Sequence, residues 1–195
     1  MPQTKLISPI GTVDYVHLTT PDTAFNADGF WSIGIKVPTK SKEAKQLREL
    51  LDKKVDEALE QFESSKRSDP PYKIDGDDTL FRFKLKAVIR SRKTGQEWKT
   101  SVNVVDSRLQ PVPKSVRIGT GSKVRVSYTT RLYQAPMGAG VAADLSGVQV
   151  IDLVEYSPNS SGFDKTDGFS AESIEADETE SYSQAQTEQA ESGDF

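Results

Sequence analysis

The sequence predicts a mainly-β fold: a small barrel of antiparallel strands with one long α-helix, followed by a disordered acidic tail. Three observations predict this fold class. Several stretches alternate apolar and polar residues with the period of two that a half-buried strand requires. One stretch, residues 41–63, instead has the period of a helix, and residues 158–195 are polar and acidic in composition.

The first predicted strand and the helix are neighbours in the sequence. FWSIGIKV (30–37) mixes aromatic and β-branched residues and stops at Pro38, as strands do. Ser41 is the predicted N-cap, because its side chain can accept a hydrogen bond from a free N–H group of the first turn. The apolar stripe of the helix consists of Ala44, Leu47, Leu51, Val55, Ala58 and Phe62. Pro70 and Pro71 cannot continue a helix, so they separate it from the strands that follow.

The segment TLFRFKLKAVIR (79–90) alternates strictly between two kinds of side chain. A strand places alternate residues on opposite faces, so Arg82, Lys84 and Lys86 share one face. Phe81 and Phe83 then point from the other face toward the core. The segment therefore predicts a strand with one basic face and one buried face.

Three further segments complete the predicted barrel. EWKTSVNVV (97–105) is predicted to return as the second arm of a hairpin with the preceding strand. GSKVRVSYTTRLY (121–133) repeats the alternation, with Lys123, Arg125 and Ser127 on one face and Val124, Val126 and Tyr128 on the other. VQVIDLVEY (148–156) is the last predicted strand.

One strand, a long helix and several twisted antiparallel strands fit a small closed or half-closed β-barrel with the helix at its side. The oligonucleotide-binding (OB) fold is the most economical barrel of this kind. We therefore predict two parts: an OB-fold domain at residues 1–157 and a disordered acidic tail at residues 158–195, which has too few apolar side chains to offset the entropy of ordering.

The charge of the chain is divided between these parts. Residues 158–195 contain ten Asp/Glu and one Lys, a net charge of −9, whereas residues 1–157 carry +5. Within that domain, residues 79–133 hold thirteen Lys/Arg against Glu97 and Asp106 only, a balance of +11. The overall net charge of −4 thus averages a basic domain and an acidic tail.

The basic strand face has the two features of a groove for single-stranded nucleic acid. Cations follow the phosphates, and exposed aromatic rings receive unstacked bases, each contributing about 1–3 kcal/mol. The predicted cations and rings are Arg82, Lys84, Lys86, Trp98, Lys123, Arg125, Tyr128 and Tyr133. From the alternation alone, a solvated barrel exterior is an equally good interpretation.

Other classes of site find no support in the sequence. There is no cysteine, and His17 is the only histidine, so neither a catalytic triad nor a zinc site is predicted. The acidic cluster at 75–78 lacks the glutamate of a calcium loop and predicts a turn. We expect no enzyme, no metal and no cofactor. Without a run of about 18 apolar residues, the chain is predicted to be soluble and intracellular and to have no membrane partner.

The acidic tail suggests regulation and docking. A flexible polyanion tethered beside a basic groove has a roughly millimolar effective concentration, so it can occupy the groove until DNA displaces it. Asp194 and Phe195 then form a compact anchor for a basic, apolar pocket on a partner. An entropic solubility tail would explain the acidic residues but not the final aromatic ring.

Several motifs together resemble one known family. They are FRFKLKA (81–87), NVVDS (103–107), GTGSKVRVSY (119–128), YQAPMGAGV (133–141) and GDF (193–195). This layout resembles the single-stranded DNA-binding protein of short-tailed bacteriophages of the T7 type. The similarity runs from about Lys5 to Tyr156 and resumes at the last three residues.

The resemblance implies an OB-fold homodimer in the cytoplasm of the infected bacterial host. It also implies a role in phage DNA replication, recombination and repair, in which the protein protects single strands and promotes annealing. The tail would contact the phage DNA polymerase and the helicase-primase. By position, the resemblance implies DNA contacts by Lys5, Lys123, Arg125 and Tyr133, and partner binding by Phe195.

An alternative function belongs to a different class. A chaperone-like or adaptor protein would bind another protein through the barrel and use the acidic tail for solubility. Sensitivity to salt separates the two hypotheses, because counterions compete steeply with phosphate binding.

Overall fold

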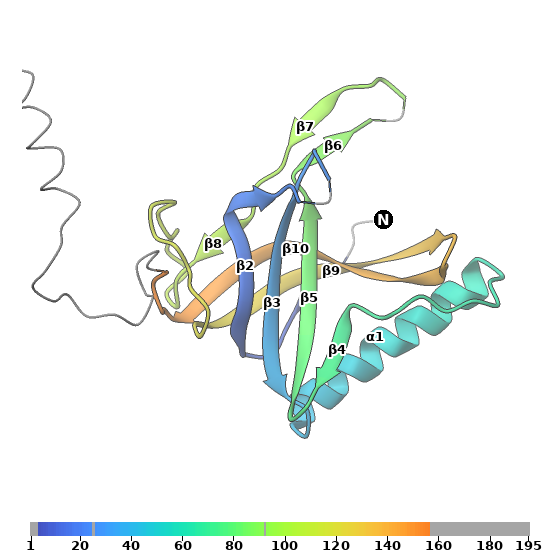
Figure 1. Cartoon of the computed structure of the whole chain (residues 1–195), viewed down its shortest axis with the longest axis horizontal. Helices are drawn as coiled ribbons and strands as arrows, with labels where there is room; N and C mark the ends of the chain where they lie inside the picture. Colours follow the sequence, from blue (N-terminus) through green and yellow to red (C-terminus); the bar gives the residue numbers. More distant parts are fainter. Residues whose placement is uncertain (1–3, 25, 92, 157–195) are drawn as a thin grey trace, which may run out of the picture. The chain divides into compact units, whose positions relative to one another are not determined.

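Five strands close into a barrel in the computed structural model, which describes residues 4–24, 26–91 and 93–156 (Figure 1). They are β2 (Gly11–Asp22), β3 (Phe30–Pro38), β5 (Asp78–Lys86), β9 (Lys123–Ala135) and β10 (Gly138–Asp152). Around the barrel their order is β2, β3, β5, β10, β9 and again β2. Neighbours are antiparallel except β5 and β10, which are parallel. This is a five-stranded barrel of the OB type, so the predicted fold class is confirmed.

Short strands extend the barrel sheet. β1 (Leu6–Ile7) pairs with β9, β4 (Tyr72–Asp75) forms a hairpin with β5, and β8 (Asn103–Val105) runs parallel to β10. The turn between β4 and β5 lies at the acidic cluster 75–78, with Gly76 at φ +61°, so the predicted turn is confirmed.

Two strands form a separate arm. β6 (Val88–Arg90) and β7 (Glu97–Lys99) pair only with each other and project from the barrel (Figure 1). We call residues 88–99 the arm. The predicted single strand at 79–90 was therefore wrong at its end, because it breaks at Ala87.

The break at Ala87 has a structural cause. The Ala87 N–H group donates to the Gly29 carbonyl, and the Ala87 carbonyl accepts from the Thr100 N–H group. These two hydrogen bonds join Ala87 to the loop before β3 and to the residue that follows β7, at the base of the arm. The predicted partner strand at 97–105 is also divided. Its first residues pair with β6, whereas its last three form β8 and pair with β10.

Four strand segments were not predicted: the short strands β1 and β4, the strand β2, and the first half of β10. β2 mixes polar and apolar residues and has an irregularity between Val13 and Tyr15, which interrupts its alternation. The first half of β10 is rich in glycine and alanine, which have low strand propensity. The predicted strands at 30–37 and 121–133 correspond to β3 and β9, and the last predicted strand is the end of β10.

The helix α1 (Lys42–Gln61) follows β3 and is capped as predicted. The Ser41 Oγ accepts a hydrogen bond from the Ala44 backbone N–H at 3.1 Å. Its buried residues are Ala44, Leu47, Leu51, Val55 and Ala58. No helix within the described part of the chain is long and apolar enough to cross a membrane.

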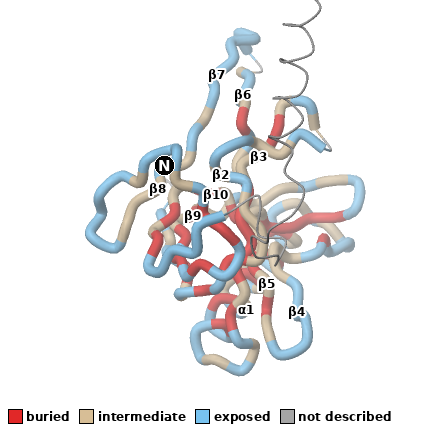
Figure 2. The backbone as a smooth tube through the Cα atoms, turned by 60° about the vertical axis from the view of Figure 1, so that its left-hand side comes forward, coloured by how far each residue is buried: buried red, intermediate tan, exposed pale blue. Residues whose placement is uncertain are grey.

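The core fills the barrel and the space beneath α1. Buried residues concentrate in the barrel strands and along one side of α1, whereas the outer strand of the arm is exposed (Figure 2). Phe81 and Phe83 are each 1% exposed, and the Phe83 ring lies 5.0 Å from the Tyr128 ring between centroids. The alternation of β5 thus buries its aromatic face, as predicted, and leaves the other face outside.

Candidate nucleic-acid interface

The outer face of β5 carries a row of three cations. Arg82 is half-buried, and Lys84 and Lys86 are exposed. None of the three makes an ion pair with another residue of the described chain. We call Arg82, Lys84 and Lys86 the basic row. Its positive charge is uncompensated by neighbouring carboxylates within ion-pair distance, so it attracts polyanions.

The basic row forms one wall of a cleft of about 260 Å³. Strand β10 lies beside β5, with Asp144 opposite Lys84 in the register, and β9 pairs with the other edge of β10. Residues of β9 and β10 therefore form the other wall. The cleft is lined by Phe30, Asp69, Pro70, Pro71, Arg82, Lys84, Lys86, Arg131, Tyr133, Val141, Ala142, Ala143 and Asp144. The structure thus brings together four predicted residues, the basic row and Tyr133.

Tyr133 owes its place in the cleft to a glycine on the next strand. Gly140 lies directly opposite Tyr133 in the β9–β10 register. A Cβ atom at Gly140 would lie 3.0 Å from the Tyr133 hydroxyl oxygen and 2.9 Å from Ser68 Cβ. The missing side chain therefore leaves room for the Tyr133 ring beside β10.

Tyr15 flanks the basic row on its other side. Its ring covers Gly34 of β3, where an added Cβ would overlap Tyr15 Cε1. Gly34 lies opposite Arg82 in the β3–β5 register. Burial raises the pKa of Tyr15, and the nearby charge of Arg82 acts in the opposite direction. The predictions missed Tyr15; the glycine within the strand 30–37 was the available signal, since an interior glycine often marks a close approach.

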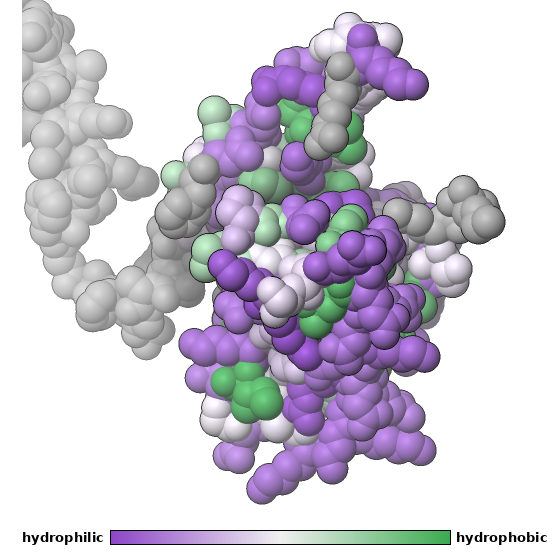
Figure 3. Space-filling model, turned by 90° about the vertical axis from the view of Figure 1, so that its right-hand side faces the viewer, coloured by the Kyte–Doolittle hydropathy of each residue, from purple (hydrophilic) through white to green (hydrophobic). Residues whose placement is uncertain are grey.

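Carboxylates compensate two cations near the basic row. Arg131 binds Asp144 through two hydrogen bonds of 2.7 and 3.0 Å, and this partner raises the pKa of Arg131. Lys36 forms an ion pair with Asp14 at 2.8 Å. Figure 3 views the molecule from the side that holds the C-terminal end of α1 and the tip of the β9–β10 hairpin. The surface on this side is predominantly hydrophilic, with apolar groups in small patches.

Tyr128 is not at the surface, so its predicted contact with DNA was wrong. Its side chain is 1% exposed and packs against Phe83 in the core. Burial raises its pKa to about 12. The alternation that places Lys123 and Arg125 outside places Tyr128 inside, because Tyr128 lies five positions after Lys123 and three after Arg125, both odd offsets.

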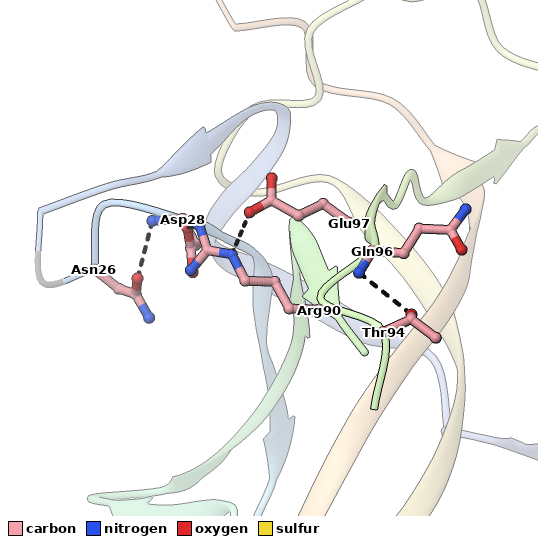
Figure 4. Close-up of polar contacts among 6 residues, drawn as sticks. All are labelled: Asn26, Asp28, Arg90, Thr94, Gln96 and Glu97. Carbon is pink, nitrogen blue, oxygen red and sulfur yellow. Dashed lines mark hydrogen bonds and ion pairs between the residues drawn. The ribbon is translucent and has the colours of Figure 1, made fainter. Parts of the chain in front are cut away.

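Trp98 lies on the arm, away from the residues that line the cleft. It is 46% exposed and faces Ile89 across the β6–β7 pair. Arg90 fixes the arm to the loop before β3, because its guanidinium binds both the Asp28 carboxylate and Glu97 (Figure 4). This ion-pair cluster thus links the arm that carries Trp98 to the loop before β3.

Two of the three remaining predicted cations lie along the first half of β9, and the third, Lys5, lies before β1. Lys123 and Arg125 are exposed, opposite Asp152 and Gln149 in the register. Lys123 precedes Tyr133 by ten residues, about 33 Å along a strand. Lys5 is exposed just before β1, which pairs with β9 at Ser127 and Tyr128. These three cations do not line the cleft. The predicted anchor residues Asp194 and Phe195 lie outside the described residues.

Comparison with known proteins identifies the family. The family model described as single-stranded DNA-binding protein of bacteriophage T7 matches residues 10–153, more than half of the chain. The chain belongs to this family. The resemblance predicted from the motifs is thereby confirmed.

Relatives of the family cover most of the chain. The single-stranded DNA-binding proteins of Escherichia phage T7 and Enterobacteria phage T3 are 25% and 26% identical to it over 176 residues. Each comparison covers 76% of this chain and 76% of the relative.

Two solved structures share the fold. The crystal structure of gp2.5, a single-stranded DNA-binding protein encoded by bacteriophage T7, has a TM-score of 0.70 at 24% identity and covers 87% of this chain and 100% of that chain. The single-stranded DNA-binding protein from bacteriophage Enc34, in complex with single-stranded DNA, has a TM-score of 0.56 at 12% identity, covering 84% of this chain and 89% of that chain. These likenesses support the assignment of the barrel.

Proposed function

We propose that this protein binds single-stranded DNA of a phage on the outer face of β5. The observation that carries the proposal is the cleft lined by Tyr133 and by three cations that form no ion pair with a described residue. Cations that follow the phosphates, beside aromatic rings on which bases stack, are the two components of single-strand recognition without sequence preference. We assign no catalytic residue and no cofactor to this activity.

The residues divide into two roles. Arg82, Lys84 and Lys86 neutralise phosphates, and Tyr133 stacks on a base. Lys5, Lys123 and Arg125 extend the positive surface along β9, and Trp98 on the arm offers a second ring. Because these residues do not line the cleft, they imply a strand that continues beyond it, as OB-folds with site sizes of about 4–16 nucleotides allow.

The biological role follows the family. We propose that the protein acts as a homodimer in phage DNA replication, recombination and repair, in the cytoplasm of the infected host. It protects single strands and promotes their annealing. Residues 158–195 recruit the phage DNA polymerase and helicase-primase through their acidic side chains, with Asp194 and Phe195 as the anchor. The charge contrast between +5 for residues 1–157 and −9 for 158–195 supports competition between tail and DNA.

A salt titration tests the DNA-binding proposal. A fluorescent single-stranded oligonucleotide is titrated with the full chain and with residues 1–157 at several salt concentrations. We expect steep salt dependence for both proteins and tighter binding by the shorter one. Affinity that does not respond to salt would favour the adaptor hypothesis instead. If the shorter protein binds no more tightly, competition by the tail is wrong.

Two variants separate DNA binding from recruitment. Lys123→Ala with Arg125→Ala should weaken DNA binding and flatten its salt dependence, whereas deletion of Phe195 should leave DNA affinity near normal and abolish binding of the polymerase. Equal loss of both functions in both proteins would refute this division of roles.

A further inference from the structure

A second cavity lies where β2 parts from β9. These strands pair only at Gly11 and Thr12, and the register of β2 shifts between Val13 and Tyr15. Beyond the shift, segments that precede β9 line the opposite side and leave a cavity of about 900 Å³. Its volume falls within the range of about 300–1,000 Å³ that is usual for sites of small organic molecules.

The cavity has an apolar inner wall and a polar rim. The inner wall is formed by half-buried side chains that pack against the core: Val16, Leu18, Trp31, Val102 and Val104. The rim offers hydroxyl and amide groups: Thr19, Thr20, Ser101, Asn103, Thr120 and Ser146. An apolar wall with a few hydrogen-bonding groups at the edge suits a flat heterocycle, which has apolar faces and polar edges.

The charge at the rim is positive. Lys114 and Arg117 are exposed at the cavity and form no ion pair with any residue that the structure describes. Among the described residues that line the cavity, Asp14 is the one acid, and its carboxylate is already bound to Lys36 at 2.8 Å. The rim therefore favours a ligand that carries negative charge beside its apolar faces.

Strand β2 borders both the cavity and the basic row. Tyr15 is among the residues that line the cavity, and its ring covers Gly34, the residue opposite Arg82. Arg82 is close enough for its charge to act on the Tyr15 hydroxyl. The same segment of β2 thus contributes residues to the cavity and to the surface beside the basic row.

We infer that this cavity is a second nucleotide subsite, in which unstacked bases of the bound strand insert while Lys114 and Arg117 hold the adjoining phosphates. The inference rests on the proposed binding of single-stranded DNA to the basic row. It assigns the cavity to bases rather than to a polypeptide, because the site combines an apolar wall, hydrogen-bonding groups and cations that form no ion pair with a described residue.

Trp31 provides a direct readout of base insertion. The sequence contains two tryptophans, so Trp98→Phe leaves Trp31 as the single emitter, and Trp31 lines the cavity. Oligothymidylates of about 4 and about 16 nucleotides, the limits of OB-fold site sizes, are titrated into this variant. The long strand should quench Trp31 and the short strand, held on the basic row, should not. Binding of the long strand without a change in Trp31 emission would overturn the inference.

Cavity variants test the same inference through affinity. Val116→Phe places a ring in the cavity, and its control, Ile74→Phe, places one on the exposed strand β4. Val116→Phe should weaken binding of the long strand about tenfold, the equivalent of one stacked base, and leave the short strand unchanged. Ile74→Phe should change neither.

A pair of surface variants avoids any effect of the ring on folding. Lys114→Ala with Arg117→Ala removes the rim cations, and Lys42→Ala with Lys45→Ala removes the same charge from the exposed side of α1. Only the first pair should weaken the long strand selectively. If wild-type protein binds both strands but neither cavity variant discriminates between them, the subsite is wrong and the proposed function stands. If wild-type protein binds neither strand, the proposed function itself fails.

Discussion

Tyr128 and Tyr133 lie five residues apart on the same strand and have opposite surroundings. Tyr128 is buried against Phe83, whereas Tyr133 lines the cleft beside the basic row. The odd separation places the two rings on opposite faces of β9. In this barrel the face of the strand, and not the type of residue, decides whether an aromatic ring belongs to the core or to the interface.

The largest effect expected from this comparison is on stability. Tyr128→Ala should lower the free energy of unfolding by about 3–5 kcal/mol, since it removes a large buried ring and leaves a cavity. Tyr133→Ala should cost less than Tyr128→Ala, because the Tyr133 ring lines an open cleft. Urea unfolding of both variants checks the difference. Equal losses of stability would contradict the assignment of the two faces.

The next effect is the response of stability to alkaline pH. The pKa of Tyr128 is about 12 in the folded protein against 10.0 for an unperturbed phenol, so the unfolded chain loses this proton first as pH rises. The contribution is fully present below pH 10 and declines as pH rises through 12, by about 2–3 kcal/mol.

Tyr128→Phe removes this ionisation. Its stability should therefore fall less steeply between pH 10 and 12 than that of the wild type, as measured by urea unfolding at each pH. Tyr133→Phe is the matched control on the same strand. If Tyr128→Phe follows the wild-type pH profile, burial of the phenol does not govern the decline.

Periodicity correctly predicted the elements whose sequence pattern lies within one continuous segment. The alternation of β5 and β9 placed Phe81, Phe83 and the cations on the correct faces, and Ser41 marked the start of α1. It also placed Tyr128 inside, and the error lay in proposing that ring for DNA nonetheless. The basic row could thus be predicted because one strand determines it.

Features that depend on distant partners could not be predicted in this way. The break at Ala87 is set by hydrogen bonds to Gly29 and Thr100, and the pairing of β8 with β10 leaves no mark on the period of either strand. The glycines of β10 weaken its strand pattern, yet Gly140 is needed to accommodate Tyr133. The cleft itself depends on this close approach, so it became visible only in three dimensions.

The third effect is on DNA affinity. Tyr133→Ala should weaken binding of a single-stranded oligonucleotide about tenfold, within the range of about 1–3 kcal/mol for one stacked base. Tyr133→Phe keeps the ring and should bind nearly as the wild type does. Fluorescence anisotropy at one fixed salt concentration measures all three proteins. A loss as large for Tyr133→Phe would mean that the hydroxyl group, not stacking, contributes the affinity.

The smallest effect compares the cations of the two halves of β9. Arg125 forms no ion pair with a described residue, whereas Arg131 is bound by Asp144 in two hydrogen bonds. A phosphate contact made by a free cation contributes about 0.7 to the slope of log affinity against log salt for single strands. Arg125→Gln should therefore reduce the slope by about 0.7. Arg131→Gln should reduce the slope less, because Asp144 already neutralises the charge of Arg131. Loss of the Arg131 guanidinium also frees the Asp144 carboxylate to repel the strand. The main effect of Arg131→Gln should thus be weaker binding at every salt concentration. A larger change of slope for Arg131→Gln would show that DNA displaces Asp144 and that the second half of β9 is the principal phosphate contact.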